Sequence, residues 1–278
     1  GTFGLKATYG RLTRAGSFPF VSSLDHLGPL CRSVADLAAA YDAMRGHDAA
    51  DPACVDRPAD PLTPVLDQGI EGLRIAKADG YFRTGAMPEA LAALDDVAAT
   101  LCVGRSIQIP DADIARSAAF IITTTEGVAL HLRRLRERPQ DFDPEVRDRL
   151  IAGALIPAAA VAQAQKFRRL YRDRVLALFD TVDAILAPAT PCIAPKIGQK
   201  TFVLDGVEMP VRPNIGIFTQ PISFIGLPVV AVPVPTASGM PIGVQVIAPP
   251  WREDIAIRIA RALEVRGAAR TLTPNLEA

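Results

Sequence analysis

The stretch that decides the fold class reads PVVAVPV (residues 228–234), PTASGMP (235–241), GVQVIAP (243–249) and REDIAIRIARALEVRG (252–267). The first and third pieces are short apolar runs bounded by proline or glycine, a pattern typical of buried strands. PTASGMP carries the residues of a turn, and the last piece repeats apolar residues at helical spacing between charges. Strand, turn, strand and amphipathic helix in this order predict an α/β protein.

Further strands are expected upstream of this unit. GLRIAKA (72–78) and RSIQIP (105–110) flank a helical pattern from Pro88 to Cys102, which predicts a β-α-β unit with parallel strands. DAILAPATP (183–191) predicts another strand, and the Asp-Gly pair in TFVLDGVEMP (201–210) predicts a tight hairpin.

Helical patterns occupy much of the remaining chain. The first opens at the N-cap residue Ser33 and ends near Gly46, with Val34, Leu37, Tyr41 and Met44 expected on its buried face. Three more run from residue 115 to 136, 144 to 154 and 158 to 179, the second opening with Asp143 as N-cap and Pro144 at the first helical position.

Composition excludes several function classes. The chain has 278 residues, and its 30 Lys+Arg balance its 30 Asp+Glu, so no basic excess indicates nucleic-acid binding. No apolar run approaches the length of a membrane span. The four cysteines show no CxxC pair and no histidine at ligand spacing. We therefore expect a reduced, cytoplasmic chain without a structural metal, a membrane contact or a direct nucleic-acid partner.

Familiar catalytic motifs are absent from the sequence. It contains no GxSxG, SxxK, HExxH, P-loop or GxGxxG pattern. Lys6 with Ser22 or Ser23 offers the residue types of a serine–lysine pair, but their spacing does not orient them, and we interpret the pair as coincidence. His26 and His131 lack a partnered nucleophile, and we interpret both as satisfied, partly buried histidines.

Several separated segments resemble one family, the amidase signature enzymes. They are GLKATYGRLTRAG (4–16), SSLDHLGPLCRSVADLA (22–38), FIGLPVVAVPV (224–234) and MPIGVQVIAPPWRED (240–254), in the family's order. The resemblance implies an amidase signature fold, with a mixed β-sheet core covered by helices on both sides. It also implies a single domain over residues 1–278 that is incomplete at its N-terminus.

In that family the nucleophile is a serine, assisted by a second serine and a lysine, and all three precede the segment that GLKATYGRLTRAG resembles. The resemblance therefore implies that this chain begins just after the nucleophile and holds no catalytic residue. The chain alone is expected to be inactive, while the complete protein is expected to hydrolyse amides through a serine acyl-enzyme. No cofactor is implied.

Within the family the chain is most similar to carboxybiuret hydrolases, on SFPFVSSLDHLGP (17–29), FTQPISFIGLP (218–228) and VIAPPWREDIA (246–256). The implied function is hydrolysis of a C–N bond in a small, carboxylated, urea-like substrate. The alternatives are a glutamine amidotransferase A-type subunit, or a non-catalytic remnant or binding subunit. The family also implies two kinds of partner, a second copy of the chain in a homodimer and a small accessory subunit.

Two positions bear on the substrate. Arg149 in FDPEVRDRLIAG occupies the place of an arginine that clamps the substrate carboxylate in glutamine-using relatives. Gly216 in PNIGIFTQP stands where those relatives have an aspartate for the ammonium group. The resemblance thus implies an acid without an α-amino group. The alternative for Arg149 is a surface ion pair with Glu145, four residues earlier on the same helix.

The remaining candidates have polar or turn-forming side chains. Thr124, within the run Thr123–Glu126, either faces the substrate or meets solvent, and Gln220 is expected to present its amide to the substrate. Ser23 and Asp25 resemble the family's loop beneath the active site, where a short aspartate fixes the loop through backbone N–H groups. Gly226 is expected to shape the turn before residues 228–234.

Overall fold

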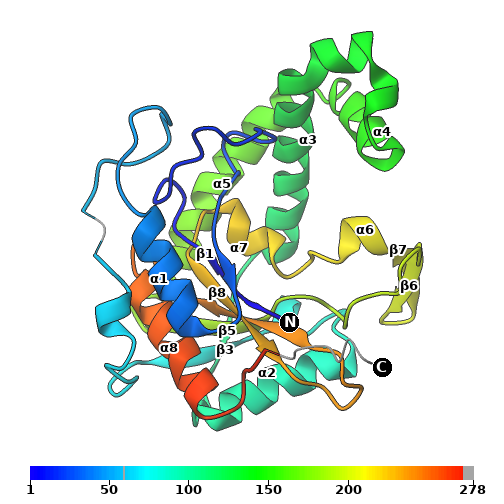
Figure 1. Cartoon of the computed structure of the whole chain (residues 1–278). Helices are drawn as coiled ribbons and strands as arrows, with labels where there is room; N and C mark the ends of the chain where they lie inside the picture. Colours follow the sequence, from blue (N-terminus) through cyan, green and yellow to red (C-terminus); the bar gives the residue numbers. More distant parts are fainter. Residues whose placement is uncertain (59, 272–278) are drawn as a thin grey trace, which may run out of the picture.

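The computed structural model describes residues 1–58 and 60–271, and its centre is a seven-stranded sheet (Figure 1). The strand order is β2-β1-β8-β9-β5-β3-β4. The bounds of the strands are β1 Phe3–Lys6, β2 Leu30–Cys31, β3 Ile75–Asp79, β4 Ser106–Gln108, β5 Ala184–Pro188, β8 Val229–Val234 and β9 Ile242–Ile247.

The sheet is mixed. β3 pairs in parallel with both β4 and β5, as the predicted β-α-β unit around α2 (Pro88–Thr100) requires. The other neighbours are antiparallel, including β8 and β9, which form the predicted hairpin before α8 (Glu253–Val265). The predicted mixed α/β class is therefore confirmed.

One face of the sheet is covered by α1 (Val34–Met44), α2 and α8 (Figure 1). Residues alternate along the strands, so Val230, Val232 and Val234 of β8 pack on this side. Ser33 caps α1 by accepting a hydrogen bond from the backbone N–H of Asp36, as predicted. Met44 is a correction, because its side chain is 38% exposed at the last turn of α1 rather than buried.

The opposite face is covered by α3 (Ala112–Glu137), α5 (Ala158–Leu178) and the short α7 (Gln220–Phe224). Ile185 of β5 and Ile247 of β9 point to this side, opposite to their chain neighbours Leu186 and Val246. Helices therefore cover both faces of the sheet, as expected.

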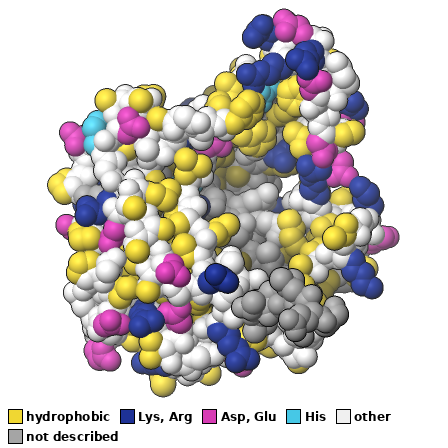
Figure 2. Space-filling model, in the orientation of Figure 1, with side chains coloured by type: hydrophobic (Ala, Val, Ile, Leu, Met, Phe, Trp, Pro, Cys, Tyr) yellow, Lys and Arg dark blue, Asp and Glu magenta, His cyan; other side chains and the backbone are white. Residues whose placement is uncertain are grey.

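A helical extension projects from this second layer. The C-terminal half of α3 packs on α4 (Pro144–Gly153) through a small cluster of Val128, Leu135 and Leu150. Asp143 caps α4 by accepting from the N–H of Glu145. The predicted hairpin, β6 (Thr201–Leu204) and β7 (Val207–Pro210), lies beside the main sheet and leads into α6 (Val211–Asn214). Figure 2 shows the surface hollowed between the extension and the rest of the molecule.

Two segments differ from the sequence expectation. The sequence patterns above assign no strand to residues 1–30, but Phe3–Lys6 is a strand inside the sheet between β2 and β8. Glycine and proline are frequent around it and weaken the strand pattern. Gln220–Phe224 form the short helix α7, which the sequence patterns above do not predict; Pro221 lies in its first turn, a position compatible with a helix.

All four cysteines are free thiols. Within residues 1–58 and 60–271 no single helix is long and apolar enough to cross a membrane. The bent pair α4 and α5 reaches that length and composition only when both helices are counted together. The single-domain assignment over residues 1–278 stays a prediction, since it includes positions outside the described residues.

Candidate substrate pocket around Arg149

Arg149 lies on α4 and turns its side chain toward α3. Its guanidinium carbon is 4.3 Å from the centre of the Phe120 ring, a cation–π contact. Its Nε approaches the Thr124 hydroxyl oxygen at 3.5 Å. Phe120 and Thr124 are four residues apart on α3 and therefore share one helix face. The structure thus brings Arg149 and Thr124 together.

The two helices approach closely at Gly153, the last residue of α4. A Cβ atom built there would lie 2.6 Å from the backbone oxygen of Thr124. The Thr124 hydroxyl already donates to the backbone oxygen of Phe120 at 2.6 Å, so only its lone pairs remain for other partners. Thr124 is buried, which excludes the expectation that it meets solvent.

Arg149 lines a cavity of about 550 Å³. Most of its walls are apolar, and they come from the loop before residue 21, from α3, from α4 and from the segment of α6. The lining residues are Phe20, Phe120, Thr124, Glu145, Val146, Arg149, Leu150, Ala152, Ile156, Arg212 and Pro213. A few polar groups in a mainly apolar cavity are the usual composition of a small-molecule site.

The ion pairs at the rim leave Arg149 uncompensated. Glu145 pairs with Lys200 and with Arg212, both at 3.1 Å, and Arg212 also pairs with Asp143. In the described part of the chain no carboxylate lies within 4 Å of the Arg149 guanidinium, so the alternative pair with Glu145 is absent. Burial lowers the pKa of Arg149 from its ordinary value, yet a guanidinium keeps its charge.

Gly216 lies in the segment that joins α6 to α7, and Gln220 is the first residue of α7. The backbone oxygen of Gly216 accepts from the N–H groups of Thr219 and Gln220. The Gln220 side-chain oxygen accepts from Arg116 Nε at 3.0 Å, and Arg116 also binds Asn214. Because arginine only donates, the Gln220 amide nitrogen is left as its free donor. Neither Gly216 nor Gln220 lines the Arg149 cavity, although the neighbouring Pro213 does.

Ser23 and Asp25 organise the loop that carries Phe20. The Asp25 carboxylate accepts from the backbone N–H groups of Phe20 and Val21, both at 2.8 Å. The hydroxyl and N–H of Ser23 donate to Glu126 of α3 at 2.7 and 3.1 Å. These bonds fix the loop against α3, which is the geometry expected of residues that hold shape.

Gly226 adopts φ +71° directly before β8, a left-handed conformation that favours glycine. Its backbone oxygen accepts from the N–H of Tyr9 at 3.0 Å, and a Cβ here would lie 2.7 Å from the Tyr9 Cβ. The turn and the first loop of the chain therefore pack against each other at this residue.

The other titratable candidates do not form a nucleophilic pair. Lys6 donates to the backbone oxygen of Leu227 rather than to a serine, and burial lowers its pKa to about 7. His26 and His131 correct the expectation of satisfied histidines. The Nε2 of His26 and the Nδ1 of His131 are buried without a hydrogen-bond partner among the described residues. His131 instead stacks on Phe18, with ring centres 5.6 Å apart.

Sequence reasoning missed Arg116 and Phe120. Together with Thr124 they form a stripe at i, i+4 and i+8 on α3, a spacing visible in the sequence. The prediction of substrate-facing residues on this helix was based on the continuous polar run Thr123–Glu126 instead. Among the described residues no group of three His, Cys, Asp or Glu is placed to hold a metal ion.

Comparison with known proteins identifies the family. The model of the amidase family matches residues 1–256, which contain the whole seven-stranded sheet and all of its covering helices except most of α8. The chain therefore belongs to the amidase family.

The chain is also similar to individual members of this family. The chain is 52% identical over 272 residues to AtzE, a 1-carboxybiuret hydrolase subunit of a Pseudomonas species, covering 97% of this chain and 60% of that protein. It is 34% identical to the A-type subunit of the glutamyl-tRNA(Gln) amidotransferase of Myxococcus xanthus, covering 95% and 59%. The chain thus spans about three fifths of the length of these relatives.

Solved structures agree in fold. One, presented as an unexpected vestigial protein complex that reveals the origins of an s-triazine catabolic enzyme, matches with a TM-score of 0.95 at 52% identity. It covers 97% of this chain and 60% of that chain. The A-type subunit of the glutamyl-tRNA(Gln) amidotransferase of Thermotoga maritima matches with a TM-score of 0.77 at 28% identity, covering 95% and 57%.

Proposed function

We propose that the protein carrying this chain is an amidohydrolase that cleaves a C–N bond in a small, carboxylated, urea-like substrate. In this proposal Arg149 binds the substrate carboxylate and the apolar walls of its cavity exclude water around that contact. The 52% identity to a 1-carboxybiuret hydrolase subunit supports this substrate class.

One observation carries the proposal. Arg149 holds its charge in a mainly apolar cavity without a carboxylate within 4 Å among the described residues. The side chain is half-buried, and a charge partly removed from water is costly unless it is paired, so the site favours an anionic ligand. A guanidinium presents parallel N–H donors that match the two oxygens of a carboxylate. The paired Glu145 and Arg212 at the rim leave Arg149 as the unbalanced charge.

The residues of this chain supply binding and scaffold in the proposed reaction rather than the nucleophile. In the described part no serine hydroxyl is hydrogen-bonded to a lysine or a histidine, and the Ser23 hydroxyl is bound to Glu126. We infer that a serine acyl-enzyme forms with groups outside these residues. Gln220 does not line the Arg149 cavity, so its amide N–H₂ would meet a substrate oxygen only where the substrate extends beyond that cavity; Arg116 holds its other end.

Glutamine is the competing substrate, because relatives at 34% identity belong to glutamyl-tRNA(Gln) amidotransferases. An α-amino acid needs a counter-charge for its ammonium group as well as one for its carboxylate. The resemblance places that counter-charge at Gly216, which does not line the Arg149 cavity; Gly216 has no side chain, and its nearest side-chain neighbours are the neutral Thr219 and Gln220. This favours an acid without an amine.

The proposed partners are a second copy of the chain and a small accessory subunit, in line with the protein complex found for a structural relative. We also infer a reducing, cytoplasmic location from the four free cysteines. Native mass spectrometry of the protein purified from its own source would detect both kinds of partner.

The test is ammonia release from carboxybiuret, allophanate and glutamine, measured with the longest polypeptide that the gene encodes and, in parallel, with residues 1–278 alone. We expect turnover of carboxybiuret by the longer polypeptide only. Preferred turnover of glutamine would contradict the proposed substrate, and turnover by residues 1–278 alone would contradict the assignment of the nucleophile.

A further inference from the structure

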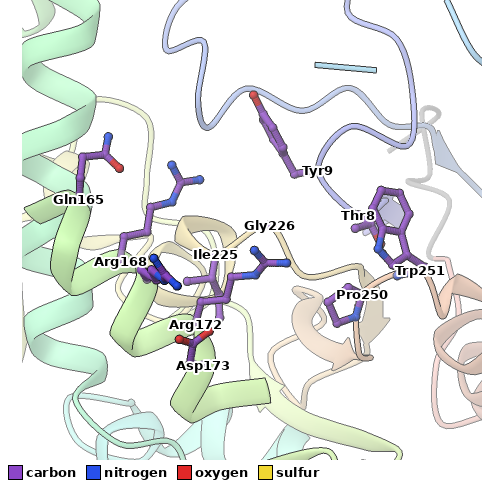
Figure 3. A pocket seen from close by; sticks show the side chains of 11 residues that line it. Thr8, Tyr9, Gln165, Arg168, Arg172, Asp173, Ile225, Gly226, Pro250 and Trp251 are labelled. Atoms are coloured by element: carbon purple, nitrogen blue, oxygen red, sulfur yellow. The ribbon is translucent and has the colours of Figure 1, made fainter. Parts of the chain in front are cut away.

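A second cavity, of about 530 Å³, lies between α5 and the loops beside Tyr9 and Trp251, and it shares no lining residue with the Arg149 cavity (Figure 3). Its walls come from segments far apart in the sequence: the loop after β1, the middle of α5, the turn before β8 and the loop between β9 and α8. The side chains that matter are Tyr9, Arg168, Arg169, Arg172, Asp173 and Trp251.

The charge in this cavity is strongly positive. Three arginines line it, against Asp173 as the acid among the described lining residues. Arg168 donates to the backbone oxygens of Phe224 at 2.7 Å and Ser23 at 2.8 Å, so it is fixed but not neutralised. Arg169 and Arg172 are exposed on α5, and in the described part no ion pair joins either of them to a carboxylate. The cavity thus holds guanidinium groups whose charges remain unpaired.

The frame around these arginines is preformed. The N–H of Trp251 donates to the Thr8 hydroxyl at 2.8 Å, and Thr8 is held in turn by the Glu253 carboxylate. Trp251 has φ 69°, a left-handed conformation rare for an aromatic residue, and such backbone strain clusters at ligand sites. The N–H of Tyr9, the residue after Thr8, donates to the backbone oxygen of Gly226 at 3.0 Å and fixes the next part of the lining.

The aromatic ring of Trp251 is already engaged. The guanidinium of Arg11 lies 4.7 Å from its centre, and that of Arg57 lies 5.1 Å from it. These contacts compete with any flat ligand ring for the indole. Arg11 is also paired with Glu253 at 3.7 Å, so the further positive charge at this wall is that of Arg57. The cavity is therefore suited to bind a ligand through charge rather than through stacking on the indole ring.

We propose that this cavity is an anion site that binds a phosphate group through Arg169 and Arg172, with Arg168 as a fixed third charge. Guanidinium forks match the geometry of phosphate oxygens, and a group with a double negative charge balances more of the arginine cluster than a single carboxylate does. The phosphate is either free inorganic phosphate or part of a small phosphate ester.

The test is isothermal titration of inorganic phosphate and of glycerol 3-phosphate into the longest polypeptide that the gene encodes, at constant ionic strength set with sodium chloride. The variant Arg169→Gln/Arg172→Gln removes the two unpaired charges. The control Arg133→Gln/Lys166→Gln removes two charges from exposed positions outside the cavity. We expect the first variant to weaken binding at least about tenfold and the control to leave it unchanged.

The two ligands separate the sources of the phosphate group. Tighter binding of glycerol 3-phosphate supports an ester, and equal or weaker binding supports inorganic phosphate. Equal loss in the variant and its control, or no binding of either ligand, would overturn the proposal. So would binding of an acidic peptide in place of both phosphates. Activity on carboxybiuret is not part of the readout, so the result is independent of the proposed function.

Discussion

The guanidinium of Arg149 on α4 lies 4.3 Å from the centre of the Phe120 ring on α3. This contact holds the positive charge in place without neutralising it, because a ring contributes a quadrupole and no net charge. The arrangement gives the side chain a fixed direction; Nε donates to Thr124, and the N–H donors of the two terminal nitrogens have no hydrogen-bond partner among the described residues. An arginine held by a carboxylate would lack these unpartnered donors.

The first prediction concerns this charge. In the longest polypeptide that the gene encodes, Arg149→Gln is expected to raise the KM for the carboxylated substrate by about 10- to 100-fold, the range of a lost charge-assisted contact. Arg149→Lys is expected to recover part of the loss, since it restores charge without the fork. Steady-state kinetics would measure both variants.

Arg133→Gln is the matched control, because Arg133 is exposed on α3 and pairs with Glu137 within the same helix. Its KM is expected to equal that of the wild type. If Arg149→Gln changed kcat and left KM unaltered, a role in substrate binding would be excluded.

The second prediction tests the close approach of α3 and α4. Gly153→Ala places a methyl group 2.6 Å from the Thr124 backbone oxygen, and the helices must separate to accept it. The free energy of unfolding is expected to fall by about 1–3 kcal/mol, as overpacking costs in other proteins. Urea unfolding would measure it.

Gly104→Ala is the control, since a Cβ at Gly104 meets open space and its backbone is not left-handed. It is expected to leave the free energy of unfolding unchanged or slightly raised. Equal effects of the two substitutions would show that the helices do not constrain each other at Gly153.

The strands of the sheet could be predicted from the sequence where the spacing of hydrophobic residues and the turn-forming residues indicate the same element bounds. β8, β9 and α8 follow directly from valine-rich runs, a Gly-containing turn and an amphipathic pattern. β1 was not predictable in the same way, because its partner β8 lies more than two hundred residues away and its four residues carry little local signal. Long-range pairing, rather than propensity, makes Phe3–Lys6 a strand.

The candidate site was predictable only in part. The resemblance pointed to Arg149, but its contact with Phe120 depends on how α3 and α4 pack, which no local pattern specifies. Arg116 was missed for the same reason, since its role arises from Gln220, 104 residues away in the sequence. A contact between side chains on two different helices can be predicted only when the relative positions of both helices are known.

The third prediction concerns the turn before β8. Gly226→Ala combines an unfavourable φ of +71° with a Cβ only 2.7 Å from that of Tyr9. Gly239→Ala has a similar φ of +79° but nothing within 4 Å, so it isolates the backbone term. We expect Gly239→Ala to cost about 1 kcal/mol and Gly226→Ala clearly more, measured by urea unfolding. Equal losses of unfolding free energy in the two variants would show that Tyr9 moves aside without a free-energy cost.

The fourth prediction is a pH dependence that originates at His26. Burial lowers the pKa of this imidazole to about 3, and the nearby Lys6 charge acts in the same direction. Its Nδ1 contacts the Leu24 backbone oxygen at 2.7 Å, so protonation would add a hydrogen to the buried Nε2, which lacks a partner among the described residues. Protonation of His26 is therefore unfavourable in the folded state.

The direction of the pH dependence follows from comparing proton binding at His26 in the folded and unfolded states. Below its ordinary pKa of 6.5 the unfolded chain binds a proton at His26 that the folded chain rejects until about pH 3. Stability is therefore lost as pH falls from 6.5 toward 3, by about 2 kcal/mol at pH 5. His26→Phe, which keeps a ring against Tyr9, is expected to remove this part of the acid sensitivity. The exposed His47→Phe is the control and is expected to keep the wild-type slope; parallel curves for all three proteins would contradict the assignment.

The last prediction tests why glutamine is disfavoured. Gly216→Asp introduces a carboxylate next to Thr219 and Gln220, where a new Cβ meets the Thr219 hydroxyl at 3.3 Å and needs only a small adjustment. If this position faces the amine of an α-amino acid, the variant is expected to lower the KM for glutamine and to raise it for carboxybiuret through repulsion of the anion. Gly216→Asn has nearly the same shape without the charge, so it is expected to raise both KM values slightly or not at all. A change shared by the aspartate and asparagine variants would assign the effect to shape, and it would remove Gly216 from the argument about substrate choice.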